Sequence, residues 1–120
     1  MANPSTGFGG AGTEVLRRSY LNSTSNTEAT IFAGVSNHIY TVLSIVIQEM
    51  ATATELIELY VDPDAGGTNI QLLYDYSIGP KETFIWSDRL VLTNTDILHF
   101  KTASASNIDI YCSYIDQQLA

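Results

Sequence analysis

Hydrophobic and polar residues alternate along most of the chain after residue 16, in short runs rich in β-branched and aromatic side chains. Successive strand residues point to opposite faces of a sheet, so this period of two predicts strands. Polar, glycine and proline clusters separate the runs at spacings typical of a β-sandwich. The predicted strands are Arg17 to Asn22, Glu28 to Ala33, His38 to Gln48, Glu55 to Asp62, Asn69 to Ser77, Glu82 to Trp86, Arg89 to Leu92, Asp96 to Thr102 and Ile108 to Ile115.

The last of these runs shows the alternation most clearly. Ile108, Ile110 and Cys112 share one face of the predicted strand, whereas Asp109 and Tyr111 share the other. One face is therefore expected in a core and the other outside it.

The run from His38 to Gln48 differs, because strict alternation places apolar residues on both of its faces. One face would hold Ile39, Leu43, Ile45 and Ile47, and the other Tyr40, Val42 and Val46. Such a strand is expected to be covered twice, either by a loop or the N-terminal arm of the same subunit or by another subunit.

A helix is the main alternative for residues 49–60, which include alanine, glutamate and leucine. Thr52 and Thr54 disfavour it, and the segment enters Tyr60 with period two, so a loop followed by a strand is predicted. The fold class is therefore all-β, a single antiparallel β-sandwich or jelly roll of about eight to nine strands over residues 17–120. Residues 1–16 contain four glycines and few large apolar side chains, which predicts a flexible N-terminal arm.

The overall charge is strongly negative. The 120 residues include 13 acidic and 5 basic side chains, a formal net charge of −8, with 45% hydrophobic residues. This composition is sufficient for one core, and the charge repels phosphate backbones and anionic lipids, so neither nucleic acid nor a membrane is expected as a partner. Self-assembly remains compatible with the charge if the contact surface is apolar. The first residues have no basic start and no apolar run, so synthesis in a cytoplasm is expected.

No group of residues has the spacing of a catalytic, cofactor or metal site. The glycine-rich stretch 7–12 lacks the strand, helix and Lys-Ser/Thr of a nucleotide-binding loop. His38 and His99 have no second His or Cys at ligand spacing, and Asp62 and Asp64 are interpreted as turn residues. Cys112 is interpreted as a small buried thiol. The chain is therefore expected not to be an enzyme and to need no cofactor or metal.

Seven tyrosines and one tryptophan suit a contact surface, because these side chains combine a large apolar area with a polar tip. Core packing is expected to account for at least half of them. Three arginines, Arg17, Arg18 and Arg89, are candidates for pairing with carboxylates of a neighbour, with ordinary surface solvation as the alternative. The candidate contact residues are Tyr40, Val42, Val46, Tyr60, Tyr111, Arg17 and Arg18.

Three segments resemble those of small β-sandwich virion proteins of tailed bacteriophages. They are residues 38–47 (HIYTVLSIVI) followed by 58–61 (ELYV), residues 90–98 (LVLTNTDIL) and residues 104–115 (SASNIDIYCSYI). The resemblance covers about residues 29–116, and it departs from the family where Thr95 replaces a glycine before Asp96.

This resemblance implies a capsid decoration (cement) protein on the surface of a virion. Such a protein binds the major capsid protein, commonly as a homotrimer, and braces neighbouring capsomers. A neck, tail or fibre component and a carbohydrate-binding β-sandwich module are the alternatives.

Overall fold

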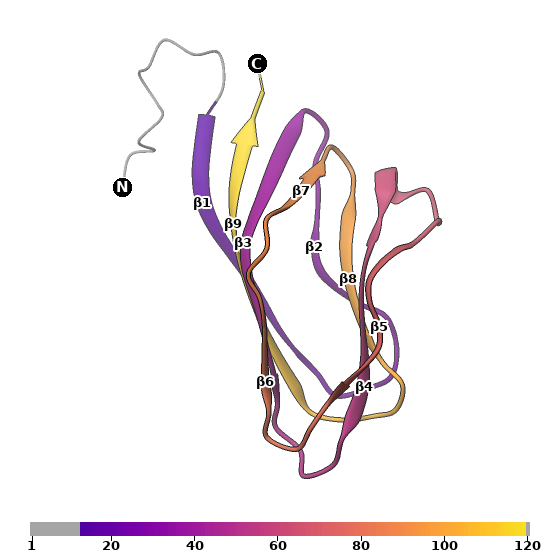
Figure 1. Ribbon diagram of the computed structural model, residues 1–120. Coiled ribbons are helices and arrows are strands. Elements are labelled where there is room, and N and C mark those ends of the chain that lie inside the picture. Colours follow the sequence, from indigo (N-terminus) through magenta and orange to yellow (C-terminus); the bar gives the residue numbers. More distant parts are fainter. Residues whose placement is uncertain (1–12, 120) are drawn as a thin grey trace.

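The computed structural model describes residues 13–119 as two antiparallel β-sheets packed face to face (Figure 1). Sheet A has the strand order β1-β9-β3-β6, with β7 also pairing with β3, and sheet B has the order β2-β8-β4-β5. The strands of sheet A are β1 (Thr13–Ser23), β3 (His38–Glu49), β6 (Thr83–Trp86), β7 (Leu90–Thr93) and β9 (Ile108–Gln118). Those of sheet B are β2 (Ala29–Ala33), β4 (Glu55–Asp62), β5 (Ile70–Ile78) and β8 (Ile97–Thr102).

The predicted β-sandwich and its strands are confirmed. All nine predicted strands are present, and each begins and ends within four residues of its predicted position. The segment 49–60 forms the end of β3, a loop and β4, as predicted, and the turn after β4 holds the short 3-10 helix η1 (Pro63–Ala65). Among residues 13–119 no helix is long and apolar enough to cross a membrane.

The predicted arm, residues 1–16, lies mostly outside the described part of the chain. Residues 13–16 are described and belong to β1, so the sandwich begins four residues earlier than predicted. The prediction failed there because Thr13–Leu16 pairs with the end of β9, which extends to Gln118 instead of ending at Ile115.

The core lies between the two sheets and consists of inward-facing side chains from both. In β9 the inward residues are Ile108, Ile110, Cys112 and Tyr114, which confirms the face predicted for that strand. Fully buried Phe100 and Leu98 of sheet B lie in the same cluster. Burying a side chain of this size contributes roughly 1.5–3 kcal/mol, so the inward faces are the main source of stability.

A β-bulge in β3 explains why its sequence is apolar on both faces. Val42 pairs with Tyr114 and Ser44 with Ser113, so Leu43 is an extra residue between two consecutive partners of β9. An extra residue reverses the inward and outward positions on its two sides. The inward side chains are Tyr40 and Val42 before the bulge and Ile45 and Ile47 after it, and all four are at most 3% exposed. The prediction of a strand that is apolar on two faces is therefore wrong.

Buried carboxylates fix the loops at one end of the sandwich. Glu49, fully buried, accepts hydrogen bonds from the Ala51 backbone N–H (2.9 Å) and the Ser106 hydroxyl (3.0 Å). Glu55 accepts the backbone N–H (3.0 Å) and hydroxyl (2.7 Å) of Ser104. These partners compensate for the loss of hydration and connect the loop after β3 to the loop after β8.

Candidate functional site

The outer face of sheet A carries a row of four apolar side chains across four strands. Tyr20 of β1 pairs with Tyr111 of β9, Tyr111 pairs with Val46 of β3, and Val46 pairs with Ile85 of β6. Tyr20 is 66% exposed, Ile85 57% and Tyr111 42%. We call these four residues the central row.

A second apolar group lies further along the same face. Leu16 pairs with Ile115, which pairs with Thr41, which pairs with Val91. Leu16 and Val91 are largely exposed, and the bulge residue Leu43 is also exposed. The bulge therefore places an additional apolar side chain outside the core.

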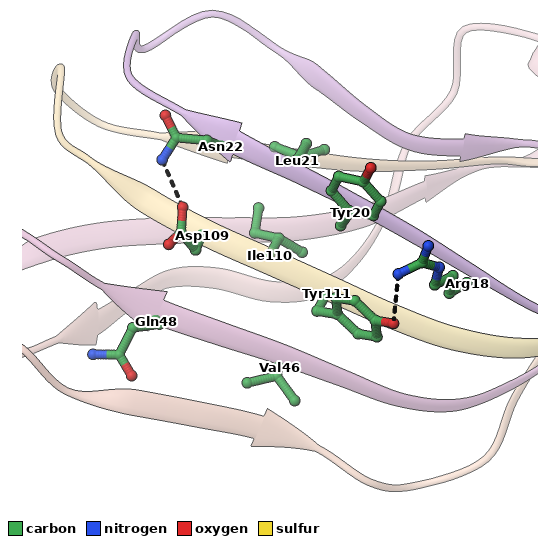
Figure 2. A pocket seen from close by; sticks show the side chains of 9 residues that line it. All are labelled: Arg18, Tyr20, Leu21, Asn22, Val46, Gln48, Asp109, Ile110 and Tyr111. Atoms are coloured by element: carbon green, nitrogen blue, oxygen red, sulfur yellow. Dashed lines mark hydrogen bonds between the residues drawn. The ribbon is translucent and has the colours of Figure 1, made fainter.

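The central row borders a groove of about 550 Å³ between β1 and β3. Figure 2 shows the side chains around it, which are those of Arg18, Tyr20, Leu21, Asn22, Val46, Gln48, Asp109, Ile110 and Tyr111. The Tyr20 and Tyr111 rings are nearly parallel, with 12° between their planes and 6.2 Å between their centroids. This arrangement is typical of a favourable aromatic pair.

Arg18 is held against the two tyrosines. Its guanidinium carbon lies 5.5 Å from the centroid of the Tyr20 ring, and Nη1 donates to the Tyr111 hydroxyl oxygen at 3.4 Å (Figure 2). The contact with Tyr20 has cation–π geometry. The hydrogen bond that Arg18 donates to the Tyr111 hydroxyl is the largest cause that raises the pKa of Arg18 above its ordinary value. Arg18 is therefore a charged group in a defined position on an otherwise apolar surface.

A row of polar side chains lies next to the central row, on the side away from Arg18. Asn22 pairs with Asp109, Asp109 with Gln48, and Gln48 with Thr83. The Asn22 amide donates to the Asp109 carboxylate at 2.7 Å, and the Thr83 hydroxyl donates to the Gln48 amide oxygen. Asp109 is thus also fixed in position, on the opposite side of the central row from Arg18.

Few charges lie on this face although the chain has a net charge of −8. The register places three charged side chains of the described strands on it, namely Glu14, Arg18 and Asp109. A protein contact surface is depleted in charge at its centre and enriched in tyrosine and arginine. The outer face of sheet A has this composition.

The structure places three of the predicted contact residues on this face, namely Val46, Tyr111 and Arg18. Arg17 extends to the rim of the sandwich, where Nε donates to the Asp116 carboxylate at 2.8 Å. Its observed partner is thus within the chain.

The other three candidates lie in the interior. Tyr40, Val42 and Tyr60 are at most 3% exposed, so they cannot contact a neighbouring protein in this fold. The bulge turns Tyr40 and Val42 inward, which strict alternation does not reveal. Burial raises the pKa of both Tyr40 and Tyr60, and each hydroxyl has a partner: Tyr40 accepts from the Val35 backbone N–H and Tyr60 donates to Glu28.

The two histidines and the cysteine, considered from the sequence for metal binding or reactivity, contact groups of the folded chain or are buried in it. His38 contacts Asp116 through Nδ1 at 2.6 Å, and His99 lies 3.4 Å from the Thr30 hydroxyl. Cys112 is fully buried, and burial raises its pKa to about 12, so it is a protonated thiol at neutral pH. Within residues 13–119 no group of three or more His, Cys, Asp or Glu residues is arranged to hold a metal ion.

Several residues of the face were not predicted from the sequence, namely Leu16, Tyr20, Ile85, Val91 and Asp109. The alternation of Leu16, Arg18 and Tyr20 within β1 was the available signal. Their alignment with Tyr111 depends on the register of β1 against β9, which no local pattern contains.

No protein-family model matches the sequence, and no curated protein matches it. Several solved structures share its fold. A chain from Bacillus endospore appendages, described as a family of disulfide-linked pili, has a TM-score of 0.57 at 17% identity over 100% of this chain and 96% of that one. A chain from the acid-stable capsid of Helicobacter pylori bacteriophage KHP30 has a TM-score of 0.53 at 11% identity over 91% and 94%.

The third structure is a chain of infectious bursal disease virus, with a TM-score of 0.53 at 10% identity over 88% of this chain and 32% of that one. At these identities the likeness concerns the fold. The same β-sandwich therefore occurs as a small separate chain in a phage capsid and as part of a longer viral chain.

Proposed function

We propose that this chain is a structural subunit of a bacteriophage virion, namely a capsid decoration or cement protein that binds the outside of the shell. The observation that carries the proposal is the outer face of sheet A, whose central row is exposed, apolar and nearly free of charge. Such a surface is suited to contact with another protein rather than to catalysis.

The size of the chain supports the capsid setting. The match to the bacteriophage KHP30 capsid structure covers nearly all of both chains, so the two have similar lengths. The strand and turn segments that resemble phage virion proteins support the same assignment.

The endospore appendage chain has the same fold and size, but a disulfide-linked assembly fits this sequence poorly. Cys112 is the single cysteine, and it is fully buried in the core with its pKa raised by burial. An exposed thiolate is needed to form a disulfide with a neighbour. Noncovalent contacts are therefore the proposed basis of assembly.

A cement protein needs contact surfaces for more than one neighbour, and the chain has further exposed apolar side chains on a second edge. The edge strand β5 carries Ile70, Tyr74 and Tyr76, which are 53%, 68% and 39% exposed, and the Tyr76 ring packs against Phe84 of β6. We propose that one surface contacts the major capsid protein and the other a second decoration subunit. Binding that favours the assembled shell raises particle stability by mass action, and repeated copies add avidity.

The experiment is a comparison of particles made with and without this chain. Cryo-electron microscopy and mass spectrometry of purified particles are expected to place it on the outer shell, in a fixed ratio to the major capsid protein. Particles that lack it are expected to form but to release DNA at lower temperature. A chain found only in the neck or tail, or absent from the particle, would contradict the proposal.

A carbohydrate-binding module is the alternative that one observation favours. Tyr20 and Tyr111 stand beside the amides of Asn22 and Gln48, and aromatic rings next to polar groups suit a sugar. Arg18, however, already contacts both tyrosines. Retention of the purified chain on a glycan array would support this alternative, since a cement protein has no need to bind sugars.

A further inference from the structure

The two fixed charges of the outer face lie on opposite sides of the central row. Arg18 is two residues from Tyr20 along β1 on one side, and Asp109 is two residues from Tyr111 along β9 on the other. Both are exposed and both are already oriented, Arg18 by the tyrosines and Asp109 by Asn22. Orienting them further on binding would cost little side-chain entropy.

A second copy of the chain can satisfy both charges at once. Two outer faces can pack together about a two-fold axis that runs along the central row. The residues on the Arg18 side of one copy then lie over the polar row of the other copy. Arg18 of each copy therefore lies next to Asp109 of the other. The apolar side chains of the two central rows meet along the axis, as in two sheets packed face to face about 10 Å apart.

The part of the face that two copies share about this axis is modest. Tyr20 lies three residues from the end of β1, so seven residues across four strand positions overlap and span roughly 450 Å² by standard strand spacings, below the roughly 800 Å² per partner of an ordinary interface. The charge complementarity of Arg18 and Asp109 therefore carries the inference, and the expected pair is a weak one. The charges that give the chain its net −8 lie mostly elsewhere, so the two faces can approach with limited repulsion.

We infer that the outer face of sheet A binds the same face of a second copy, with two symmetric Arg18–Asp109 pairs across a two-fold axis. A closed interface of this kind uses one surface patch on both subunits. It gives a dimer in place of the trimer that the resemblance to phage decoration proteins implies. The inference rests on the proposed assembly role, to which it adds the partner of this face.

The test is sedimentation velocity on the purified full chain and on charge variants. The unmodified chain is expected to sediment as a dimer at micromolar concentration. Arg18→Asp and Asp109→Arg are each expected to raise the dissociation constant about tenfold or more, because each places like charges opposite one another in two symmetric positions. The double variant Arg18→Asp with Asp109→Arg is expected to regain most of the affinity.

Net charge provides an internal control. Asp109→Arg changes the net charge from −8 to −6, which would strengthen association if only overall repulsion mattered. Lys101→Glu, on sheet B opposite Glu58, changes the net charge by the same amount as Arg18→Asp and is expected to leave the dimer intact. Circular dichroism and a melting curve verify that each variant is folded.

A monomer at 100 μM, a trimer, or equal effects of Arg18→Asp and Lys101→Glu would each overturn the inference. So would a double variant no tighter than the single variants. Because the measurement uses the isolated chain, it can fail while the chain is still found on the capsid, and a dimer can form even if the chain is absent from particles.

Discussion

Val42 and Ser44 of β3 pair with adjacent residues of β9, Tyr114 and Ser113, although Leu43 separates them. Because of this bulge, Val42 is fully buried while Leu43 is 39% exposed. Two neighbouring residues of similar chemistry therefore have opposite environments.

This difference predicts opposite effects of the same substitution. Val42→Asp places a carboxylate without a partner in the core and is expected to lower the free energy of unfolding by at least about 3 kcal/mol. Leu43→Asp faces solvent and is expected to change it by less than about 1 kcal/mol. Urea unfolding followed by Trp86 fluorescence measures both, and equal losses would contradict the bulge.

The bulge also shows which parts of the structure a sequence reveals. Strand positions and the inward face of β9 follow from local alternation, so they could be predicted from residues such as Ile108 and Ile110. The inward direction of Tyr40 and Val42 could not, because one inserted residue reverses the alternation without any change in composition.

The contact surface was accessible to prediction only in part. Tyr111 was identified because it alternates with the core positions of β9, whereas Val46 was grouped with Tyr40 and Val42, from which the bulge separates it. Tyr20 and Ile85 join them only through the pairing of strands distant in sequence, which depends on the global register. Tertiary structure was therefore needed to bring the central row together.

A close backbone approach at Gly34 predicts a second pair of opposite outcomes. A Cβ atom built on Gly34 would lie 2.0 Å from the Asn94 carbonyl oxygen and 2.9 Å from that of Asp96, which also accepts the Gly34 N–H at 2.8 Å. Gly34→Ala must displace this turn and is expected to lower the free energy of unfolding by about 2 kcal/mol or more.

Gly66 provides the matched control for that substitution. Its φ is −85°, and an added Cβ would lie 3.4 Å from the Pro63 carbonyl oxygen, so alanine fits. Gly66→Ala is expected to be neutral or to stabilise the fold by up to about 1 kcal/mol, since it restricts the unfolded chain. Thermal melting of both variants decides this, and a Gly34→Ala protein as stable as Gly66→Ala would contradict the packing.

Asp116 links two strands at the rim and predicts an energetic coupling. Its carboxylate, 8% exposed, accepts from Arg17 Nε at 2.8 Å and contacts His38 Nδ1 at 2.6 Å. Asp116→Ala leaves both partners without their acceptor and is expected to cost about 2–3 kcal/mol. Arg17→Ala is expected to cost less than about 1 kcal/mol, because the Arg17 side chain is 51% exposed.

A double-mutant cycle measures the coupling directly. The loss for Arg17→Ala combined with Asp116→Ala is expected to be smaller than the sum of the two single losses, because the second substitution removes a partner already lost. Strict additivity would show that Arg17 is available for contacts outside the chain, as the sequence suggested.

The buried thiol of Cys112 predicts how stability depends on alkaline pH. Burial raises its pKa from 9.0 to about 12, whereas the thiol of the unfolded chain ionises near 9.0. Between pH 9 and 12 the folded chain therefore retains a proton that the unfolded chain releases, so the free energy of unfolding falls as pH rises and is unaffected below pH 9. At pH 10 the loss from this group is about 1.4 kcal/mol, because one pKa unit corresponds to 1.36 kcal/mol.

Cys112→Ala separates this loss from that of the tyrosines. Burial raises the pKa of Tyr40, Tyr60 and Tyr114 as well, and these side chains add their own loss above pH 10 in both proteins. The variant starts less stable at pH 7 because of the cavity it creates, but its urea midpoint is expected to fall less between pH 8 and 10 than that of the unmodified chain. Parallel pH profiles for the two proteins would mean that the thiol ionises as readily in the folded chain as in the unfolded one. That result would contradict the position of Cys112, which is fully buried and pairs with Ser19 of β1 and Ile45 of β3.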